Sequence, residues 1–544
     1  MQTATRQFRT LAKTYLKEVF AFFPTQATQF GFSGFDHALE SYAPEVCKDL
    51  KAMLHKAASG LRKIPLRELS FSDYFDAMLM KVELDSALFN LETVEPHKRD
   101  PAIYPETVLF SAYLLIGRDL TPWKERAEAL LSRFKAYGRL LQEARQNLKR
   151  PPKVFTEVAL EVTQGGISFF KNLKFKSNGV SKALLKELES YRQKTANDLH
   201  QYESWLTEKL LPESTGAFAI GADRYNHMLR GEHLLPYSCD DLHAIGEEHF
   251  HRIQEAMKRL SRELDPHKGW ADLLQEASAQ HPTSEQLLPV YRKLMEKTRR
   301  FVLEKNLAPF PEHDEIRVTE TPPFSQGFMP FAAYMPAPPF AKRGKGEFWV
   351  TPVSAELPKA EREARLQQHA YHKIPVIVLH ETYPGHHLQF SFLRASKSPF
   401  LKRSFSSVSC EGWALYCEEM MKEEGFYDDP LTQLSQLKDQ LWRAARVILD
   451  VSLQTGRLSA REATDLLVNE VKFPRAMAAS EVKRYVRTPT QPMSYFIGKL
   501  EILKIRDAYR QKRKERFKLV DFHREFLKCG IAPLALAEEK ILKD

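Results

Sequence analysis

The chain has 544 residues, of which 43% are hydrophobic and 28% are charged, and these values are ordinary for a soluble globular protein. The formal charge of +10 is small against 80 basic and 70 acidic residues, so acidic partners are favoured but a nucleic-acid-binding stripe is not implied. Five cysteines without a C-x-x-C pair argue against a disulfide framework, and we expect a cytoplasmic location.

Residues 1–23, MQTATRQFRTLAKTYLKEVFAFF, predict an amphipathic helix, because Phe8, Leu11, Tyr15 and Val19 recur at steps of three and four. The segment lacks the apolar core and the small-residue cleavage site of a secretory leader. No apolar run reaches the roughly 18–20 residues that span a bilayer. We therefore expect a protein that is neither exported nor inserted in a membrane.

Most of the remaining chain has helical periodicity. The clearest example begins at Ser238 and Asp241, which together are typical of a capped helix start before an apolar face. Another predicted helix has Pro122 in its first turn. The predicted helices are 122–148, 182–211, 238–264, 284–306, 358–372 and 431–455.

Residues 307–357 differ, because they are rich in proline, aromatic and β-branched residues. The strings EIRVTET and GEFWVTPV alternate like short strands on either side of a proline- and glycine-containing turn. We therefore expect a mainly α chain with a small sheet, divided into an N-terminal helical half at 1–306 and a second half at 307–544. The edge of such a sheet can hold an extended peptide by its backbone.

The stretch VIVLHETYPGHHLQ, residues 377–390, nearly matches the zinc-binding pattern H-E-x-x-H, but Pro384 stands where the second histidine is expected. On a straight helix His380 and His387 would lie about 10 Å apart along the axis, too far to share one ion. Pro384 and Gly385 should break the helix there. The break could bring His386 to the position of the second ligand, and His387 is the competing choice.

Glu411, in SCEGWALYCEEMM, is the expected third ligand, since Gly412 permits close packing of its helix beside the metal. Glu381 would then be the general base that takes a proton from the attacking water. The alternatives are a surface patch of histidines and a solvated Glu411. Glu418 lies on the same helix face as Glu411 and is either solvated or a support for a metal ligand.

A third stretch, VRTPTQPMSYFIGKLEILKIR, places Tyr495 at the start of a helix. Tyr495 and Gln491 are candidates to bind the substrate and the oxyanion of the tetrahedral intermediate, although Tyr495 could equally pack into the core. Arg446 is a candidate to bind a substrate carboxylate. It could instead pair with Asp450, four residues further along the same helix.

These segments together resemble a large bacterial family, DUF 885, and residues 23–31 and 225–248 extend the resemblance over almost the whole chain. That family is similar to gluzincin-type zinc metallopeptidases of the angiotensin-converting-enzyme and thimet-oligopeptidase kind. The resemblance implies a large helical metallopeptidase-like fold with a deep cleft and a small sheet beside the zinc site. The motifs shared with the family are HETYPGHH, EGWALYCEEM, RAARVILDVSLQTGRLS and PTQPMSYFIGKLEI.

Carried over by motif, the resemblance implies that Zn²⁺ is held by His380, His386 and Glu411, with Glu381 as the base. The string GHHL favours His386 over His387 as the second ligand. One departure from the family is Gln454, which stands where many members carry a histidine.

We therefore expect a zinc peptidase that acts on short peptides, with residues 307–544 as its catalytic half. The alternative is an inactive, peptide-binding protein of the same fold, although an intact Glu381 argues against it. A nucleic-acid-binding role for the basic run at 508–519 is disfavoured, because acidic residues interrupt the run. The sequence does not indicate the cleavage mode or the oligomeric state.

Overall fold

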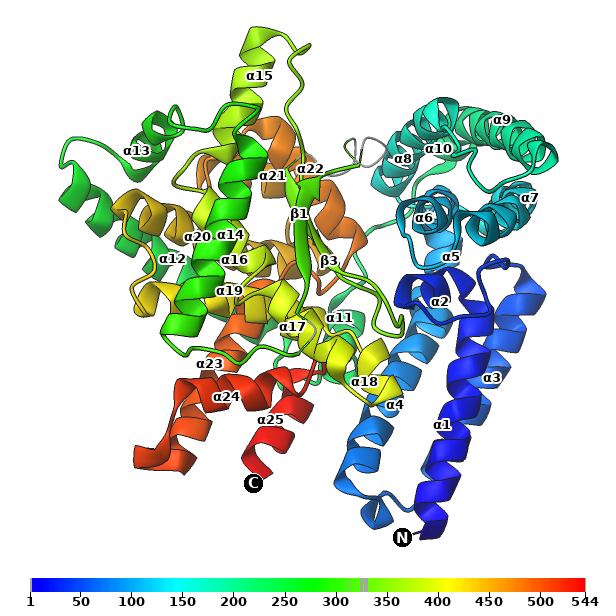
Figure 1. The fold of residues 1–544 in the computed structure, drawn as a ribbon, viewed down its shortest axis with the longest axis horizontal. Helices are drawn as coiled ribbons and strands as arrows, with labels where there is room; N and C mark the ends of the chain where they lie inside the picture. The colour runs from blue at the N-terminus through cyan, green and yellow to red at the C-terminus, as the bar shows by residue number, and fades with distance from the viewer. Residues whose placement is uncertain (1, 313, 323–325, 327–330, 544) are drawn as a thin grey trace. The chain divides into compact units, whose positions relative to one another are not determined.

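The computed structural model describes residues 2–312, 314–322, 326 and 331–543, and these residues are mainly helical (Figure 1). The strands among them form a three-stranded sheet within the second half of the chain. The expected fold class, mainly α with a small sheet, is therefore confirmed.

The chain forms two compact units, residues 1–220 with 338–344, and residues 221–337 with 345–544. Helix α12 (Cys239–Leu264) packs along α20 (Pro430–Gln454). The approach is close, because a Cβ atom on Gly246 of α12 would lie 2.9 Å from the Ile448 side chain. Residues 221–306 therefore belong with the C-terminal part of the chain, and the structure places the division at 220 and not at the expected 306.

The first unit is helical, and its first helix is amphipathic as the sequence predicts, with Phe8, Tyr15 and Val19 buried. Residues 338–344 join it through the amide of Phe340, which donates to the Phe30 carbonyl oxygen at 3.0 Å. Its elements are α1 (Gln2–Phe22), α2 (Pro24–Phe30), α3 (Pro44–Arg62), η1 (Leu66–Glu68), α4 (Phe71–Phe89), η2 (Asn90–Val94), α5 (Pro96–Arg99), α6 (Ile103–Gly117), α7 (Trp123–Asn147), α8 (Lys153–Asn172), α9 (Lys182–Trp205), η3 (Leu206–Leu210) and α10 (Leu211–Glu213).

The second unit contains the candidate site residues. Its helix α12 begins with the predicted cap, in which the side chains of Ser238 and Asp241 each bind the other residue's backbone amide. Its remaining helices are α11 (Ala222–Gly231), α13 (Trp270–Ala277), α14 (Leu287–Glu304), α15 (Lys359–Leu366), η5 (Gln367–His369), α16 (Ile374–Glu381), α17 (His386–Ala395), α18 (Pro399–Arg403), α19 (Ser407–Glu423), α21 (Ala460–Asn469), α22 (Arg475–Arg487), α23 (Ser494–Arg513), η6 (Lys514–Arg516), α24 (Leu519–Leu527) and α25 (Leu534–Lys543).

The sheet has the strand order β1 (Ile316–Glu320), β3 (Gly346–Val350), β2 (Ala332–Met335). β3 pairs with β1 in parallel and with β2 in antiparallel orientation. The two strands expected from the sequence are confirmed as β1 and β3, whereas β2 was not predicted. Side chains of β1 and β3 share one hydrophobic core with α14 and α16, which lie beside the sheet (Figure 1). This core fixes the end of α16 that carries His380.

Helices α19 and α23 cross at a pair of glycines. A Cβ atom on Gly412 would lie 2.5 Å from the Gly498 Cα atom, and one on Gly498 would lie 2.0 Å from the Val408 carbonyl oxygen. Real Cβ atoms do not approach other atoms this closely, so both positions require glycine. The crossing brings Glu411 on α19 close to the start of α23.

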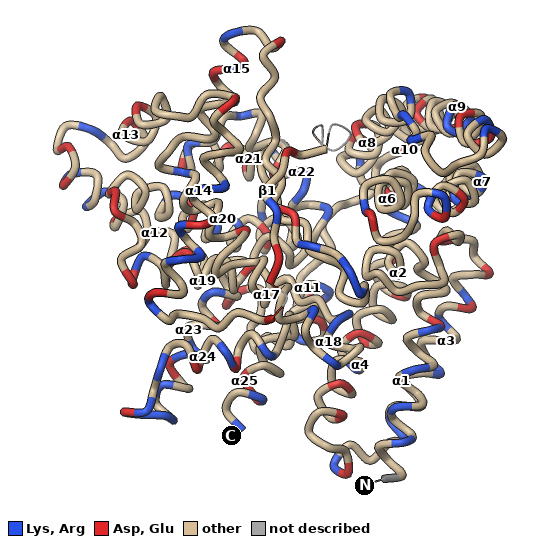
Figure 2. Tube along the Cα trace, in the orientation of Figure 1, with Lys and Arg blue, Asp and Glu red and all other residues tan. Residues whose placement is uncertain are grey.

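Basic and acidic residues are interspersed along the helices of each unit (Figure 2). This distribution fits a net charge of +10 that arises from 80 basic and 70 acidic residues. Within the described part of the chain, we find no helix whose length and hydropathy suit a membrane span.

Replacement of Gly498 by alanine should destabilise the second unit, because the added methyl group must push α19 and α23 apart. Overpacking of this kind typically costs about 1–3 kcal/mol of unfolding free energy. Gly231→Ala is a matched control, since the nearest atom to its Cβ would be the His227 side chain at 3.6 Å. Urea denaturation followed by circular dichroism should show a lower midpoint for Gly498→Ala alone. Equal midpoints for the two variants would contradict the close crossing.

Candidate metal centre

The break between α16 and α17 is the feature on which the site depends. α16 ends at Glu381 and α17 begins at His386. The Gly385 amide turns back to the Leu379 carbonyl oxygen at 3.1 Å, and a Cβ atom on Gly385 would lie only 2.0 Å from the His380 carbonyl oxygen. Position 385 therefore requires glycine. The predicted helix break is confirmed, and it brings the rings of His380 and His386 to a centroid separation of 4.7 Å.

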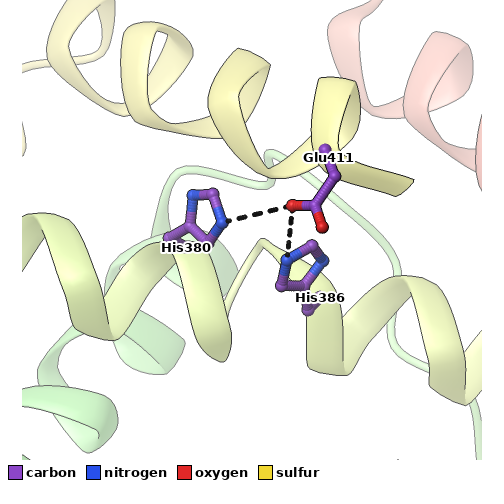
Figure 3. Close-up of side chains that lie close together, drawn as sticks. All are labelled: His380, His386 and Glu411. Atoms are coloured by element: carbon purple, nitrogen blue, oxygen red, sulfur yellow. Dashed lines mark ion pairs between the residues drawn. The ribbon is translucent and has the colours of Figure 1, made fainter. Parts of the chain in front are cut away.

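Three candidate ligand atoms converge at this break. His380 Nε2 and His386 Nε2 lie 3.9 and 3.4 Å from the Glu411 carboxylate (Figure 3). One ligand atom from each of these residues lies within 4.8 Å of the others. Four ligands at about 2.1 Å from a tetrahedral zinc ion are about 3.4 Å apart. Two imidazoles and a carboxylate are a ligand set that such an ion accepts, and the two separations from the carboxylate, 3.9 and 3.4 Å, are close to that value.

The charges around the cluster also suit a cation. Burial, and next the charge of His386, lowers the pKa of His380 well below its ordinary value, which keeps its ring neutral. Despite its burial, contacts with Cys410 and Glu411 raise the pKa of His386 well above its ordinary value. A positive charge is therefore favoured between His386 and Glu411, and a divalent cation can replace the proton there.

Glu418 orients the first histidine. Its side chain is 1% exposed, and its Oε1 lies 2.7 Å from His380 Nδ1, so Nε2 is the nitrogen that faces Glu411. A carboxylate behind a histidine ligand fixes its tautomer and increases its basicity. Of the two interpretations of Glu418 from the sequence, support for a metal ligand agrees with this geometry and a solvated side chain does not.

Glu381 is held by the edge strand of the sheet. The backbone amide of Tyr334, in β2, donates to Glu381 Oε2 at 3.0 Å. Burial raises the pKa of Glu381, and the negative charge of Glu411 acts in the same direction against the charge of His386. A carboxylate with a raised pKa, one residue from a candidate metal ligand, is suited to accept a proton and later release it.

Tyr495 reaches the cluster from the start of α23. Its hydroxyl is hydrogen-bonded to Glu411. Burial, followed by the negative charge of Glu411, raises the pKa of Tyr495, so the phenol stays protonated and remains a donor. The guanidinium carbon of Arg446 lies 4.6 Å from the centre of its ring. Tyr495 is therefore within reach of a group bound at the cluster, as the sequence interpretation requires.

Arg446 lies behind Tyr495 and is 3% exposed. Its guanidinium also lies 3.9 Å from the centre of the Trp442 ring, and its Nη2 is 3.2 Å from the Glu481 carboxylate. The expected alternative partner, Asp450, instead accepts the backbone amides of Thr490 and Met493, each at 3.3 Å. In this arrangement Arg446 supports Tyr495, and its Nη1 is buried without a partner among the described residues.

The side chain of Gln491, another predicted site residue, binds a residue outside the cluster. Its amide oxygen accepts from Arg484 at 2.8 Å. Gln454 also has a structural position. Its side-chain amide donates to the carbonyl oxygens of Tyr485 and Val486 at 3.3 and 3.1 Å. It thereby ties α20 to the end of α22, in the segment that leads to Tyr495.

His387, the alternative second ligand, points away from the cluster. Its Nε2 lies 2.7 Å from Asp314 Oδ1, and its Nδ1 is 3.0 Å from the Tyr334 hydroxyl. The structure therefore groups His386, and not His387, with His380 and Glu411.

Sequence reasoning missed Tyr334 and Asp314. Tyr334 lies in a strand of four residues that is followed by prolines, so alternation is too short to detect. Asp314 lies two residues before Ile316, where β1 begins, and has no motif of its own. The sequence signal for Glu418 was its spacing of seven residues from Glu411, which is two helical turns.

The fold is similar to that of two solved structures. A candidate lipoprotein of unknown function from Shewanella oneidensis is 23% identical, with a TM-score of 0.82 over 98% of this chain and 99% of that chain. A candidate lipoprotein from Colwellia psychrerythraea is 19% identical, with a TM-score of 0.83 over 98% of each chain. At these identities the likeness shows a shared fold.

No curated protein matches the chain. The family described as "Bacterial protein of unknown function (DUF885)" matches residues 24–541. Because this match spans nearly the whole sequence, the chain belongs to the DUF885 family of bacterial proteins.

Proposed function

We propose that the protein is a zinc-dependent peptidase that hydrolyses peptide bonds in short peptides. The observation that supports this most strongly is the convergence of His380, His386 and Glu411 within 4.8 Å, with the carboxylate of Glu381 one residue from the first ligand. Metal ligands, a proton acceptor and a hydrogen-bond donor for an oxyanion are the three groups that hydrolysis of an amide by water requires.

His380, His386 and Glu411 would hold the ion, and Glu418 and Cys410 contact the outward nitrogens of the two rings at 2.7 and 3.6 Å. When bound at such a site, zinc makes water a stronger acid and polarises a carbonyl oxygen. The side chain of Cys410 is buried, so we assign it a supporting contact only.

In the proposed reaction, Glu381 takes a proton as the oxygen of water bonds to the peptide carbonyl carbon. Tyr495 donates a hydrogen bond to the oxyanion that forms. Glu381 then gives its proton to the peptide nitrogen as the carbon–nitrogen bond breaks, which leaves a carboxylic acid and an amine. The raised pKa of Glu381 suits both proton transfers, because a group whose pKa is closer to the reaction pH can both accept and release a proton.

Two histidines and one carboxylate are also the ligand set of non-haem iron oxygenases. Those enzymes need open positions for oxygen and a reducing co-substrate, and they do not need a carboxylate base beside the metal. The placement of Glu381 and Tyr495 around the cluster favours hydrolysis. It also disfavours an inactive peptide-binding protein, since a purely structural metal site needs neither residue.

Peptides are the proposed substrates because the outer edge of β2 lies beside the cluster, with the Tyr334 amide on Glu381. An edge strand offers backbone groups that can pair with an extended peptide. The four-residue length of β2 suits a short segment of substrate.

We predict one zinc ion per chain in the purified protein, measured by inductively coupled plasma mass spectrometry. His380→Ala and Glu411→Ala should each lower zinc occupancy to near zero, because each removes one of three ligands. His267→Ala is a control at an exposed histidine and should keep the metal. Full zinc occupancy in Glu411→Ala, or iron as the bound metal, would contradict the assignment.

Glu381→Gln should keep zinc but lose nearly all hydrolysis of a mixed pool of short peptides, followed by mass spectrometry. The substitution keeps the size of the side chain and removes its basicity. Loss of a general base typically costs about 10²–10⁴ in rate. Glu356→Gln, at an exposed position, should behave like the unmodified enzyme. Near-normal turnover by Glu381→Gln would rule out the proposed proton transfer.

Tyr495→Phe should lower kcat by about 10²–10³ with little change in KM, because the lost hydrogen bond forms mainly in the transition state. The variant keeps the ring and its contacts with Arg446, so folding and zinc content should be unchanged. Steady-state kinetics on a single short peptide measures this split. An unchanged kcat would return Tyr495 to a packing role.

A further inference from the structure

His387 is buried beside the candidate metal centre but takes no part in it. Its side chain is 2% exposed, and its Nε2 lies 2.7 Å from Asp314 Oδ1. Among the described residues Nε2 has no well-aligned hydrogen bond, so its contact with Asp314 is one of proximity, and Nδ1 lies 3.0 Å from the Tyr334 hydroxyl. Asp314, His387 and Tyr334 therefore form a continuous line of polar contacts.

The Asp314 end of this line is firmly anchored. The Tyr383 hydroxyl donates to Asp314 Oδ2 at 2.8 Å, and the Ser391 hydroxyl lies 3.4 Å from Oδ1. Tyr383 lies within the break between α16 and α17, and Ser391 lies on α17. The carboxylate thus connects α17 to the break that brings His380 and His386 together.

The Tyr334 end of the line reaches the proposed base. The side chain of Tyr334 contacts His387, whereas its backbone amide donates to Glu381 Oε2 at 3.0 Å. The strand β3 leaves room for this contact, because a Cβ atom on Gly346 would lie 2.7 Å from the Tyr334 hydroxyl and 2.8 Å from His387 Nδ1. A side chain at position 346 would therefore separate the two groups.

We propose that Asp314, His387 and Tyr334 form a positioning chain that fixes β2 so that its Tyr334 amide orients the Glu381 carboxylate. An amide bound to one carboxylate oxygen restricts rotation of the side chain and leaves the other oxygen for proton transfer. The role of Glu381 as base rests on the proposed function, whereas the line of contacts to its carboxylate does not.

The positioning chain also explains why two adjacent histidines have different roles. His386 faces Glu411 through Nε2, and His387 faces Asp314 and Tyr334 on the other side of α17. Misplacement of a reacting group by about 1 Å can cost about 10²-fold in rate. A histidine that fixes the base can therefore matter to catalysis without touching metal or substrate.

The test uses Tyr334→Phe and His387→Gln in the zinc-loaded, full-length protein. Tyr334→Phe removes only the hydroxyl and keeps the ring and the backbone amide. Tyr371→Phe is the matched control, because it makes the same chemical change at an exposed tyrosine outside the site. Three quantities are measured for each variant: zinc content, amide hydrogen exchange of the segment that contains Tyr334, and kcat and KM for a short peptide.

We expect both variants to keep zinc, to exchange the Tyr334 amide faster, and to lower kcat by about 10–100-fold with KM nearly unchanged. The double variant should lose no more than the larger single loss, because the two residues act in series. Tyr371→Phe should match the unmodified protein in all three measurements.

Loss of zinc in His387→Gln would make His387 a metal ligand and overturn the proposal. If the backbone amide at position 334 exchanges no faster in Tyr334→Phe than in the unmodified protein, the proposal is also overturned, regardless of the result for His387→Gln. If the unmodified protein hydrolyses no peptide, the proposed function fails, and hydrogen exchange still decides whether the positioning chain holds Glu381.

Discussion

The candidate site depends on the absence of a side chain at Gly385. A methyl group there would collide with the last carbonyl oxygens of α16, at 2.0 and 2.5 Å from its Cβ position. Without that collision the backbone turns back on itself, and α17 starts within reach of the end of α16. On a continuous helix, the imidazoles of His380 and His386 would point in different directions. The break converts a sequence that departs from H-E-x-x-H into one in which two imidazole Nε2 atoms meet the same carboxylate.

Glycines also allow close packing at other points around the site. Gly412 and Gly498 allow α19 and α23 to cross, which brings Glu411 and Tyr495 together, and Gly346 leaves space for the contact between Tyr334 and His387. At each point a buried polar contact is made beside the glycine. The geometry of the proposed chemistry thus follows from backbone packing, and the side chains that support it are Glu418 behind His380 and Arg446 behind Tyr495.

The sequence was a good guide where one local pattern determines the result. Helical periodicity located the long helices α1, α7, α9, α12, α14 and α20, and Pro384 with Gly385 located the break that makes the histidine pair. It was a poor guide where the result depends on residues distant in sequence. The boundary at 220 follows from α12 packing on α20, and the contact of Tyr334 with Glu381 joins a four-residue strand to a helix. These two contacts leave no periodic pattern in the sequence. The position of Tyr334 and the environment of His387 could therefore not be predicted from it.

The most direct measurement of the central claim is X-ray diffraction from crystals of the purified protein, recorded on both sides of the zinc absorption edge. The account predicts one strong anomalous peak at about 2.0–2.2 Å from His380 Nε2, His386 Nε2 and a carboxylate oxygen of Glu411. A peak bound by His387, or zinc-loaded protein with no peak between these three residues, would contradict it.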